Sequence, residues 1–379
     1  MWALSSKAPA RCGMSRIRRL LQRSALPLIL TACGPPEVVR IGDAYPRDEA
    51  LMPFLAAIRP ALESTGVAIS TWSVGGNPGA SIQLNTEQAT LFADDPAVVG
   101  VVGHTGSRDA LLGAVVYNAR GVPQIVPNAT SRLLGGVGPW TFTLVPDDSV
   151  EGAFIASYAL DSLRASRVSV LYLGDEYGIG LRDGVREALR LRGTDLVDAA
   201  MIPTDWCLAE PAREIHEAII RASLRRVRPD VVVVTTGSMS GWCVAELIHA
   251  TNPETWILFG DGMDGARQVP DLPLRIVADR IRGVDYWEPG SDSASVAFVN
   301  RVERALNGPP SASHALQYDA FMLLSAAVRE AGPDRKAVRR WLESLGRTRE
   351  PWQGLTGPIA FNRPRTELLR MSGPTITVR

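Results

Sequence analysis

The sequence predicts an α/β protein with two lobes, each built on a doubly wound parallel sheet. From residue 38 onward, short apolar runs alternate with segments in which apolar residues recur at helical spacing. Near-continuous apolar strands separated by amphipathic helices indicate parallel sheets that are covered on both faces. Because a length of 379 residues suits about two domains, we expect two sheets rather than one large open sheet.

The first sheet is expected to form from the segments that precede residue 141. The run VVGVVG at 98–103 is fully apolar and indicates a buried strand, while the segment 49–64 gathers its apolar side chains on one helical face. Strands are expected at 38–42, 67–73, 98–103 and 123–126, with helices at 49–64, 81–93 and 108–119.

The same alternation resumes after residue 148 and predicts the second sheet. Three irregular stretches interrupt it, at 141–148, 281–289 and 355–361, and the first is expected to mark the break between the lobes. Strands are expected at 168–174, 197–202, 230–235 and 256–259, with helices at 150–164, 180–191, 211–225, 242–250, 295–306 and 315–331.

The charge distribution argues against a nucleic-acid-binding protein. The chain has 40 basic and 40 acidic residues, but residues 1–32 hold six of the basic residues and no acidic one. The remainder therefore carries a net charge of −6, whereas binding to nucleic acid requires a basic surface. We expect no enzymatic activity either, because the sequence lacks the GxSxG, HExxH and P-loop motifs.

The N-terminus predicts a lipoprotein signal peptide over residues 1–32. Four arginines between residues 16 and 23 precede an apolar run at 25–32, which is the order of a secretion signal. The ending LTAC at 30–33 looks like a bacterial lipobox, so Cys33 is expected to carry the lipid that attaches the protein to a membrane surface. Residues 33–37 would then be a tether. The alternatives are a plain signal peptide and a buried N-terminal helix.

Two cysteines outside the export segment, Cys207 and Cys243, are expected to form a disulfide. An exported protein folds in an oxidising compartment, where an even number of cysteines favours pairing. The bond would close a loop of about 35 residues and stabilise the fold by about 3 kcal/mol in the entropic model. The alternative is two buried free thiols.

Several motifs occur in an order that is typical of one protein family. Residues 98–131 combine an apolar strand ending in glycine, a polar loop with serine, a helix and the strand GVPQIVPNATS. Family-like runs follow at PDDSVEG (146–152), GDEYGIGL (174–181), YDA (318–320) and LTGPIAFN (355–362). Together they resemble the type I periplasmic binding proteins of the leucine/isoleucine/valine-binding family, over most of residues 38–379.

The resemblance implies two α/β lobes joined by three crossing segments, with a ligand held between them. Lobe one would comprise residues 38–144 and 286–355, and lobe two residues 145–285 and 356–379. A small amino-acid-like solute is the implied ligand, and the permease of an ABC transporter is the implied partner. The protein would be a monomer on the periplasmic side of a bacterial membrane, with no cofactor and no bound metal.

The ligand carboxylate is expected to bind in lobe one at Ser107, Asn128 and Thr130. These residues match the family's carboxylate-binding positions, with Asn128 acting through its backbone. Both segments follow predicted strands, and a helix N-terminus presents free backbone N–H groups to an anion. The alternative is ordinary helix capping, for which serine and threonine are favoured whether or not a ligand binds.

The other end of the ligand is expected to meet Tyr177, Ser238 and Asp261 in lobe two. Tyr177 would lie in the loop after a strand, where family members place an aromatic ring. Asp261 would pair with an ammonium group of the ligand. The alignment leaves Asp264 as an alternative residue for this role. The other alternative is that Asp261 is a solvated aspartate in a turn. Ser238 lacks the aromatic ring usual at its position, so a branched-chain amino acid is not implied.

Two other roles for the same fold remain open at this point. The protein would be a ligand sensor that reports to a signalling partner, or a lipoprotein that activates a cell-wall synthase through protein–protein contacts. His104 is expected to be a loop histidine, because the four histidines are scattered without metal-ligand spacing.

Overall fold

The computed structural model describes eight stretches of the chain, and all of them belong to the unit Pro36–Arg379. No helix among these residues is both long and apolar enough to cross a membrane. The described residues are 39–45, 51–66, 68–71, 82–203, 212–236, 238–262, 278–290 and 292–373.

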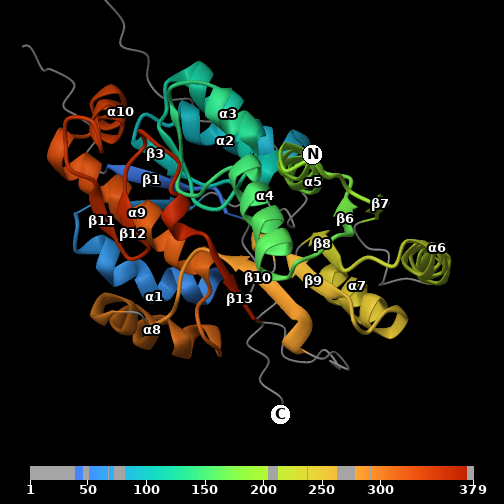
Figure 1. Ribbon diagram of the computed structural model, residues 1–379. Helices are drawn as coiled ribbons and strands as arrows, with labels where there is room; N and C mark the ends of the chain where they lie inside the picture. The colour runs from blue at the N-terminus through green and yellow to red at the C-terminus, as the bar shows by residue number, and fades with distance from the viewer. Residues whose placement is uncertain are drawn as a thin grey trace, which may run out of the picture. The chain divides into compact units, whose positions relative to one another are not determined.

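The first sheet consists of parallel strands in the order β2-β1-β3-β4-β5. Helices α2 and α3 lie side by side against it (Figure 1), while α9 packs on β1, β3 and β4 and contacts α1 and α10. The strands are β1 (Arg40–Asp43), β2 (Ala68–Thr71), β3 (Val98–Val102), β4 (Gln124–Val126) and β5 (Thr141–Thr143), and the helices are α1 (Leu51–Glu63), α2 (Ile82–Asp94), α3 (Ser107–Arg120), α8 (Ser293–Leu306), α9 (Ala312–Ala331) and α10 (Arg335–Ser344).

The second sheet has the order β13-β10-β9-β8-β6-β7, and only β13 runs antiparallel to its neighbour. Helix α5 packs on β6 and β8, and α7 packs on β8 and β9. The strands are β6 (Val168–Leu173), β7 (Asp198–Ile202), β8 (Val231–Thr235), β9 (Trp256–Phe259), β10 (Ile281–Asp285) and β13 (Arg370–Ser372), and the helices are α4 (Asp148–Ser157), α5 (Glu176–Leu191), α6 (Ala212–Val227) and α7 (Ser238–Thr251).

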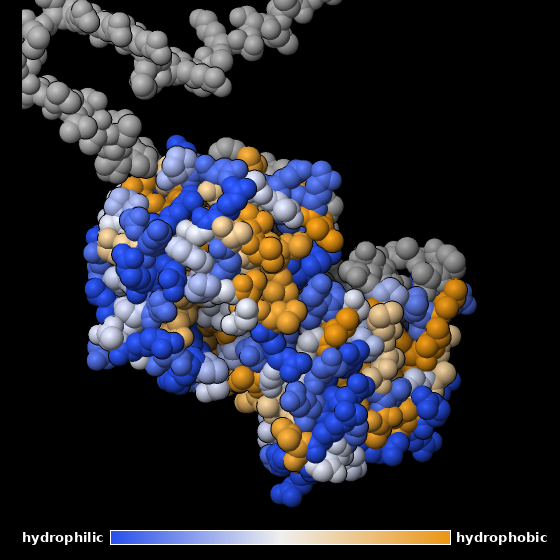
Figure 2. Space-filling view, turned by 90° about the horizontal axis from the view of Figure 1, so that it is seen from above, coloured by the Kyte–Doolittle hydropathy of each residue, from blue (hydrophilic) through white to orange (hydrophobic). Residues whose placement is uncertain are grey.

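The burial of the strands explains why the apolar runs predicted them well. All of the side chains in Val231–Thr235 are fully buried, because β8 lies between β6 and β9 and helices cover the sheet. Aspartates at 147, 175, 292 and 334 cap helices by accepting backbone N–H groups of the first turn. On the face shown in Figure 2, hydrophilic residues predominate and apolar side chains gather in separate patches.

Helices α4 and α5 pack with their backbones almost in contact, because glycines line the crossing. A Cβ atom on Gly184 would lie 2.2 Å from the carbonyl oxygen of Asp148, and one on Gly152 would lie 2.4 Å from the carbonyl carbon of Gly184. A Cβ atom on Gly180 would lie 2.2 Å from Asp148 Oδ2. The glycines therefore let the first turn of α4 lie directly against α5.

Three sequence expectations about local structure need correction. Residues 281–285 are not irregular but form β10, a parallel strand that pairs with β9. The stretch near 355–361 contains a short hairpin of β11 (Trp352–Gly354) and β12 (Gly357–Ile359). Helix α10 was not predicted, because its many arginines mask the buried face of Val338, Trp341 and Leu342.

The chain passes between the sheets at three places, after β5, after β10 and between β12 and β13. Buried Arg365 links the first and third of these. Its Nη1 donates to the carbonyl of Leu144 at 2.9 Å, and its Nη2 donates to the carbonyl of Thr356 at 3.0 Å. Asp319 of α9 accepts from Leu355 N at 2.6 Å and from Thr356 N at 2.8 Å.

Candidate functional site

Two predicted residues of lobe one follow neighbouring strands of the first sheet. Ser107 is the first residue of α3, shortly after β3, and Thr130 lies four residues beyond the end of β4. Because β3 and β4 pair in parallel, their carboxyl ends share one edge of the sheet. The backbone N–H of Ser107, in the first turn of a helix, has no intrahelical acceptor.

The hydroxyls of Ser107 and Thr130 are buried and have no hydrogen-bond partner among the described residues. Neither residue caps a helix. The N-cap of α3 is Gly106, and the 3-10 turn at Arg132–Gly136 is capped by Ser131, which accepts from Leu133 N. The capping explanation therefore fails for both residues. A buried hydroxyl without a partner costs free energy, which a ligand with polar atoms would recover.

Asn128 contributes differently from the two hydroxyls. Its Oδ1 accepts from the hydroxyl of Tyr45 at 3.3 Å, and its Nδ2 donates to Ser313 Oγ at 3.4 Å. Tyr45 follows β1 and is buried. The side chain of Asn128 is thus engaged by Tyr45 and Ser313, and the role expected for its backbone stays a prediction.

His104 lies in the loop between β3 and α3, as expected, and its side chain is buried. Its Nε2 lies 3.0 Å from the hydroxyl of Tyr117. Burial lowers the pKa of His104 to about 4, which keeps the ring neutral. Across the described stretches, no group of three or more His, Cys, Asp or Glu residues is placed to hold a metal ion.

Tyr177 lies in the first turn of α5, not in the preceding loop as expected. The aspartate cap at position 175 starts the helix four residues earlier than the apolar pattern suggests. The Tyr177 hydroxyl accepts from Gly262 N at 3.1 Å, and it also bonds the side chain of Asp261, just beyond β9. Tyr177 and Asp261, two of the predicted residues, are therefore adjacent.

Two buried acids beside this pair were not singled out from the sequence, although they lie in the family-like run PDDSVEG. Glu151 of α4 accepts from Asp261 N at 2.9 Å through Oε1 and from the hydroxyl of Tyr286 at 2.6 Å through Oε2. Asp148, one turn earlier, is 1% exposed, and neither of its carboxylate oxygens has a hydrogen-bond partner among the described residues. Its backbone N–H donates to the carbonyl of Thr130 at 2.7 Å.

Burial shifts the pKa of both acids. It raises the pKa of Asp148 to about 8; the nearby Thr130 hydroxyl opposes this rise and the negative charge of Asp261 adds to it. Burial also raises the pKa of Glu151 to about 7, against the hydrogen bonds from Tyr286 and from the Asp261 N–H. The site thus joins Thr130 of the first lobe to a group of carboxyls in the second.

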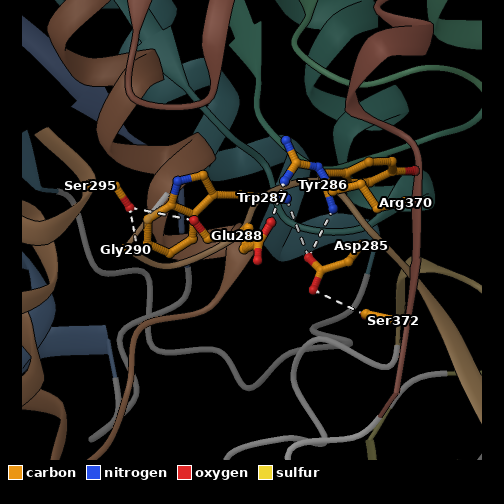
Figure 3. A network of polar contacts seen from close by, with 8 residues as sticks. All are labelled: Asp285, Tyr286, Trp287, Glu288, Gly290, Ser295, Arg370 and Ser372. Carbon is orange, nitrogen blue, oxygen red and sulfur yellow. Dashed lines mark hydrogen bonds and ion pairs between the residues drawn. The ribbon is translucent and has the colours of Figure 1, made fainter. Parts of the chain in front are cut away.

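The segment after β10 is bonded to elements on both sides of it (Figure 3). Ser372 Oγ of β13 donates to Asp285 Oδ2 at 3.4 Å, and Arg370 pairs with Glu288 at 3.0 Å. On the other side, Gly290 N donates to the Ser295 hydroxyl in the first turn of α8 at 2.7 Å. The second crossing therefore has defined anchors at both ends.

The remaining predicted residues are less informative. Ser238 is the first residue of α7, which follows β8. Cys243 lies within α7, but Cys207 is outside the described residues, so the predicted disulfide stays a prediction. Asp264 and Cys33 also fall outside the described part of the chain.

Two parallel α/β sheets, three crossings between them and polar side chains at the strand ends define the class of two-lobed solute-binding proteins. The periplasmic binding protein family model matches residues 76–370. Leu/Ile/Val-binding protein homolog 1 of Brucella abortus is 31% identical over 282 residues, which cover 72% of this chain and 70% of the relative. The chain therefore belongs to the periplasmic binding protein family, in its branched-chain amino-acid branch.

Solved structures agree on the fold. A leucine-binding protein of Thermotoga maritima superposes with a TM-score of 0.71 at 20% identity, covering 88% of this chain and 93% of that one. A solute-binding protein of Rhodopseudomonas palustris in complex with benzoate gives a TM-score of 0.68 at 18% identity, covering 88% and 91%. The family consists of extracytoplasmic binding proteins, not enzymes.

Proposed function

We propose that this protein binds a small polar solute, an amino acid or a related carboxylate, between its lobes and delivers it to an ABC-type permease. The carboxylate binds at Ser107 and Thr130, with the backbone of Asn128, and the opposite end of the solute meets Tyr177 and Asp261. Ligand contacts with both lobes stabilise a closed state that the permease recognises. In this proposal, lobe one comprises residues 38–144 and 286–355, and lobe two comprises residues 145–285 and 356–379. Ser238 contacts the ligand from lobe two.

The buried hydroxyls of Ser107 and Thr130 carry this proposal. They lie at adjacent strand ends, neither one caps a helix, and neither has a hydrogen-bond partner in the described chain. Family membership supports the same reading, as does the leucine- or benzoate-binding named in the structures of similar fold.

We also propose that the protein is exported and anchored by a lipid on Cys33, as a monomer. The arginines at 16–23, the apolar run at 25–32 and the LTAC ending support this part. Labelling with a radioactive or clickable fatty acid, compared between the wild type and Cys33→Ser, tests it directly. Absence of label from the wild type would reject the anchor and leave the solute-binding role intact.

A thermal-shift screen tests the binding role. The panel contains amino acids, amides, short carboxylates, aromatic carboxylates, polyamines and sugars. A ligand at 100 times its Kd adds about 2.7 kcal/mol to the unfolding free energy, which raises Tm by about 5–11 °C in a domain of this size. Ser107→Ala should remove most of the shift, because a hydrogen bond to a carboxylate contributes about 1.5–3 kcal/mol.

Ser325→Ala provides a matched control for this experiment. Ser325 lies in α9 and also has a buried hydroxyl with no hydrogen-bond partner among the described residues. The Ser325→Ala substitution should leave the ligand-induced rise in Tm unchanged. Equal ligand-induced rises in Tm for Ser107→Ala and Ser325→Ala would contradict the assignment of Ser107. If no compound raises the Tm of the wild type, the result would favour the role of a protein–protein scaffold over solute binding.

A further inference from the structure

A cavity of about 410 Å³ lies at the third crossing and shares no residue with the proposed solute site. One wall is the turn that follows α10, residues 346–351, and the other is formed by residues between 358 and 367, which lead from β12 into the crossing. All of these residues are described in the structure. The volume lies within the range of about 300–1,000 Å³ that is usual for small-molecule sites.

The two walls of the cavity are fastened to each other. Asn362 Nδ2 donates to the carbonyl of Gly346 at 2.6 Å, and a Cβ atom on Gly346 would lie 2.6 Å from the Cβ atom of Ala360. Within the turn, the carbonyl of Ser344 accepts from the three successive N–H groups of residues 347–349, each at 3.0 Å. The cavity is therefore preformed, so a ligand can bind without first ordering its walls.

Arginines predominate among the charged side chains of the lining. Arg349 pairs with Glu330 at 3.0 Å and Arg363 pairs with Glu367 at 3.2 Å, but both pairs are exposed and such pairs contribute little. Arg347 is exposed, and its side chain bonds no described residue. Four arginines face two glutamates, an excess of two positive charges, at positions 347, 349, 363 and 365 against 350 and 367.

Arg365 is the buried member of this group, with 4% of its surface exposed. Its two Nη atoms donate to the carbonyls of Leu144 and Thr356, which hold the guanidinium in place. Its Nε has no hydrogen-bond acceptor among the described residues. The charges of Asp319 and Glu367 already act on Arg365, so what this side chain lacks is an acceptor. An unsatisfied buried donor costs free energy, which a ligand oxygen would recover.

We propose that this cavity is a second binding site, which takes a small multivalent oxyanion of the phosphate or dicarboxylate type. Arg347 and Arg363 bind the anion from the two walls, and the Nε–H group of Arg365 donates to it from the interior. The planar fork of a guanidinium matches the oxygens of phosphate and carboxylate groups, and a dianion balances the excess of two positive charges. The site is separate from the proposed solute-binding function and does not depend on it.

Inorganic phosphate is the first probe, in thermal-shift and calorimetric titrations of the purified protein at constant pH and ionic strength. Phosphate should raise Tm along a saturable curve, whereas chloride should not. Succinate and citrate are titrated in parallel, and the tighter class identifies the ligand as phosphate-like or as a carboxylate. Arg347→Gln should weaken binding of that anion about tenfold, the contribution of one hydrogen bond from a charged donor. Arg347→Lys should recover part of the affinity, because it keeps the charge and loses the fork.

Arg340→Gln is the matched control. Arg340 of α10 is exposed, its side chain bonds no described residue, and it does not line the cavity. This variant removes the same charge and should leave anion binding unchanged. Equal losses in Arg340→Gln and Arg347→Gln would indicate a general effect of charge and overturn the proposal.

Two further results would also overturn this second site. One is the absence of a saturable rise in Tm with phosphate, succinate and citrate alike. The other is anion binding that is lost in Ser107→Ala and kept in Arg347→Gln, which would place the anion in the solute site. Neither result contradicts the solute-binding function, because that function is tested with its own panel of ligands.

Discussion

The Tyr286 hydroxyl donates a 2.6 Å hydrogen bond to Glu151 Oε2, and this contact joins the helix that follows the first crossing to the segment of the second. The other carboxylate oxygen of Glu151 accepts from Asp261 N. A Cβ atom on Gly260 would lie 2.9 Å from Glu151 Oε1, so the loop after β9 approaches α4 closely. One buried glutamate thus fixes both the loop after β9 and the segment of the second crossing.

Tyr286→Phe should lower stability by about 1–3 kcal/mol, because it leaves a buried carboxylate oxygen without its donor. The expected fall in Tm is about 2–12 °C, measured by thermal unfolding without ligand. Tyr318→Phe is a fair comparison, since the ring of Tyr318 packs on Phe298 and its hydroxyl bonds no described residue. Equal effects of the two changes would contradict the role assigned to the Tyr286 hydroxyl.

The stability of the unliganded protein should fall as the pH rises from about 5 to 8. The pKa of Asp148 is raised to about 8 in the folded state, against about 3.9 for an unfolded aspartate. The folded state therefore holds a proton that the unfolded state has released, and this stabilisation is full below pH 4 and lost as the pH approaches 8. Glu151, with its pKa raised to about 7, acts in the same direction.

Asp148→Asn should flatten this dependence, measured as urea unfolding at each pH. The contribution of one group cannot exceed a slope of about 1.4 kcal/mol per pH unit. Asp161→Asn should not change the slope in this range, because the hydrogen bond from Arg192 lowers the pKa of Asp161. Neutral His104 contributes an opposite slope below about pH 6.5 in both proteins, so the comparison of the two slopes decides: a slope that Asp148→Asn leaves unchanged would show that Asp148 is ionised throughout.

Most of the fold was predictable because it depends on local patterns that burial enforces. Runs such as 231–234 are apolar throughout, since parallel strands are covered on both faces. The prediction was wrong at Ile281–Asp285, where Arg282 and Gly283 interrupt the apolar pattern although the backbone still pairs with β9. Pairing between strands that are distant in sequence is not encoded in local composition.

The candidate site was only partly predictable. Ser107 and Thr130 follow apolar strands, and that position indicates a site in any parallel sheet. Asp148 and Glu151 lie in helix α4, and its local sequence does not distinguish them from the solvated acids that most helices carry. Their burial follows from Gly152, Gly180 and Gly184, which bring α4 and α5 together, and no spacing rule reveals that crossing.

Arg365→Met should destabilise the protein by about 2–3 kcal/mol, because Arg365, at the third crossing, bonds the carbonyl of Leu144 at the first crossing and the carbonyl of Thr356 before β12. Each lost bond from a charged donor leaves a buried carbonyl unsatisfied. Arg349→Met removes an exposed ion pair with Glu330 and should cost at most about 1 kcal/mol. The two variants are compared by denaturant unfolding, and a smaller effect at Arg365 would exclude its role at the crossings.

The predicted Cys207–Cys243 disulfide should appear as the absence of free thiols in the exported, unfolded protein. Reduction should lower stability by about 2–4 kcal/mol, and Cys243→Ser should match the reduced wild type. Thiol titration under denaturing conditions gives the answer directly. Two titratable thiols in protein taken from the periplasm would leave the alternative of two free cysteines.

Thr130→Val should abolish ligand binding without weakening the unliganded fold. The substitution keeps the shape of the side chain and removes a buried hydroxyl that has no hydrogen-bond partner among the described residues. Removing an unsatisfied polar group is neutral or stabilising by about 1 kcal/mol, whereas removing a structural hydrogen bond costs about that amount. Denaturant unfolding and ligand titration on the same variant separate the two roles. A loss of stability with binding retained would make Thr130 a structural residue and move the carboxylate site away from the end of β4.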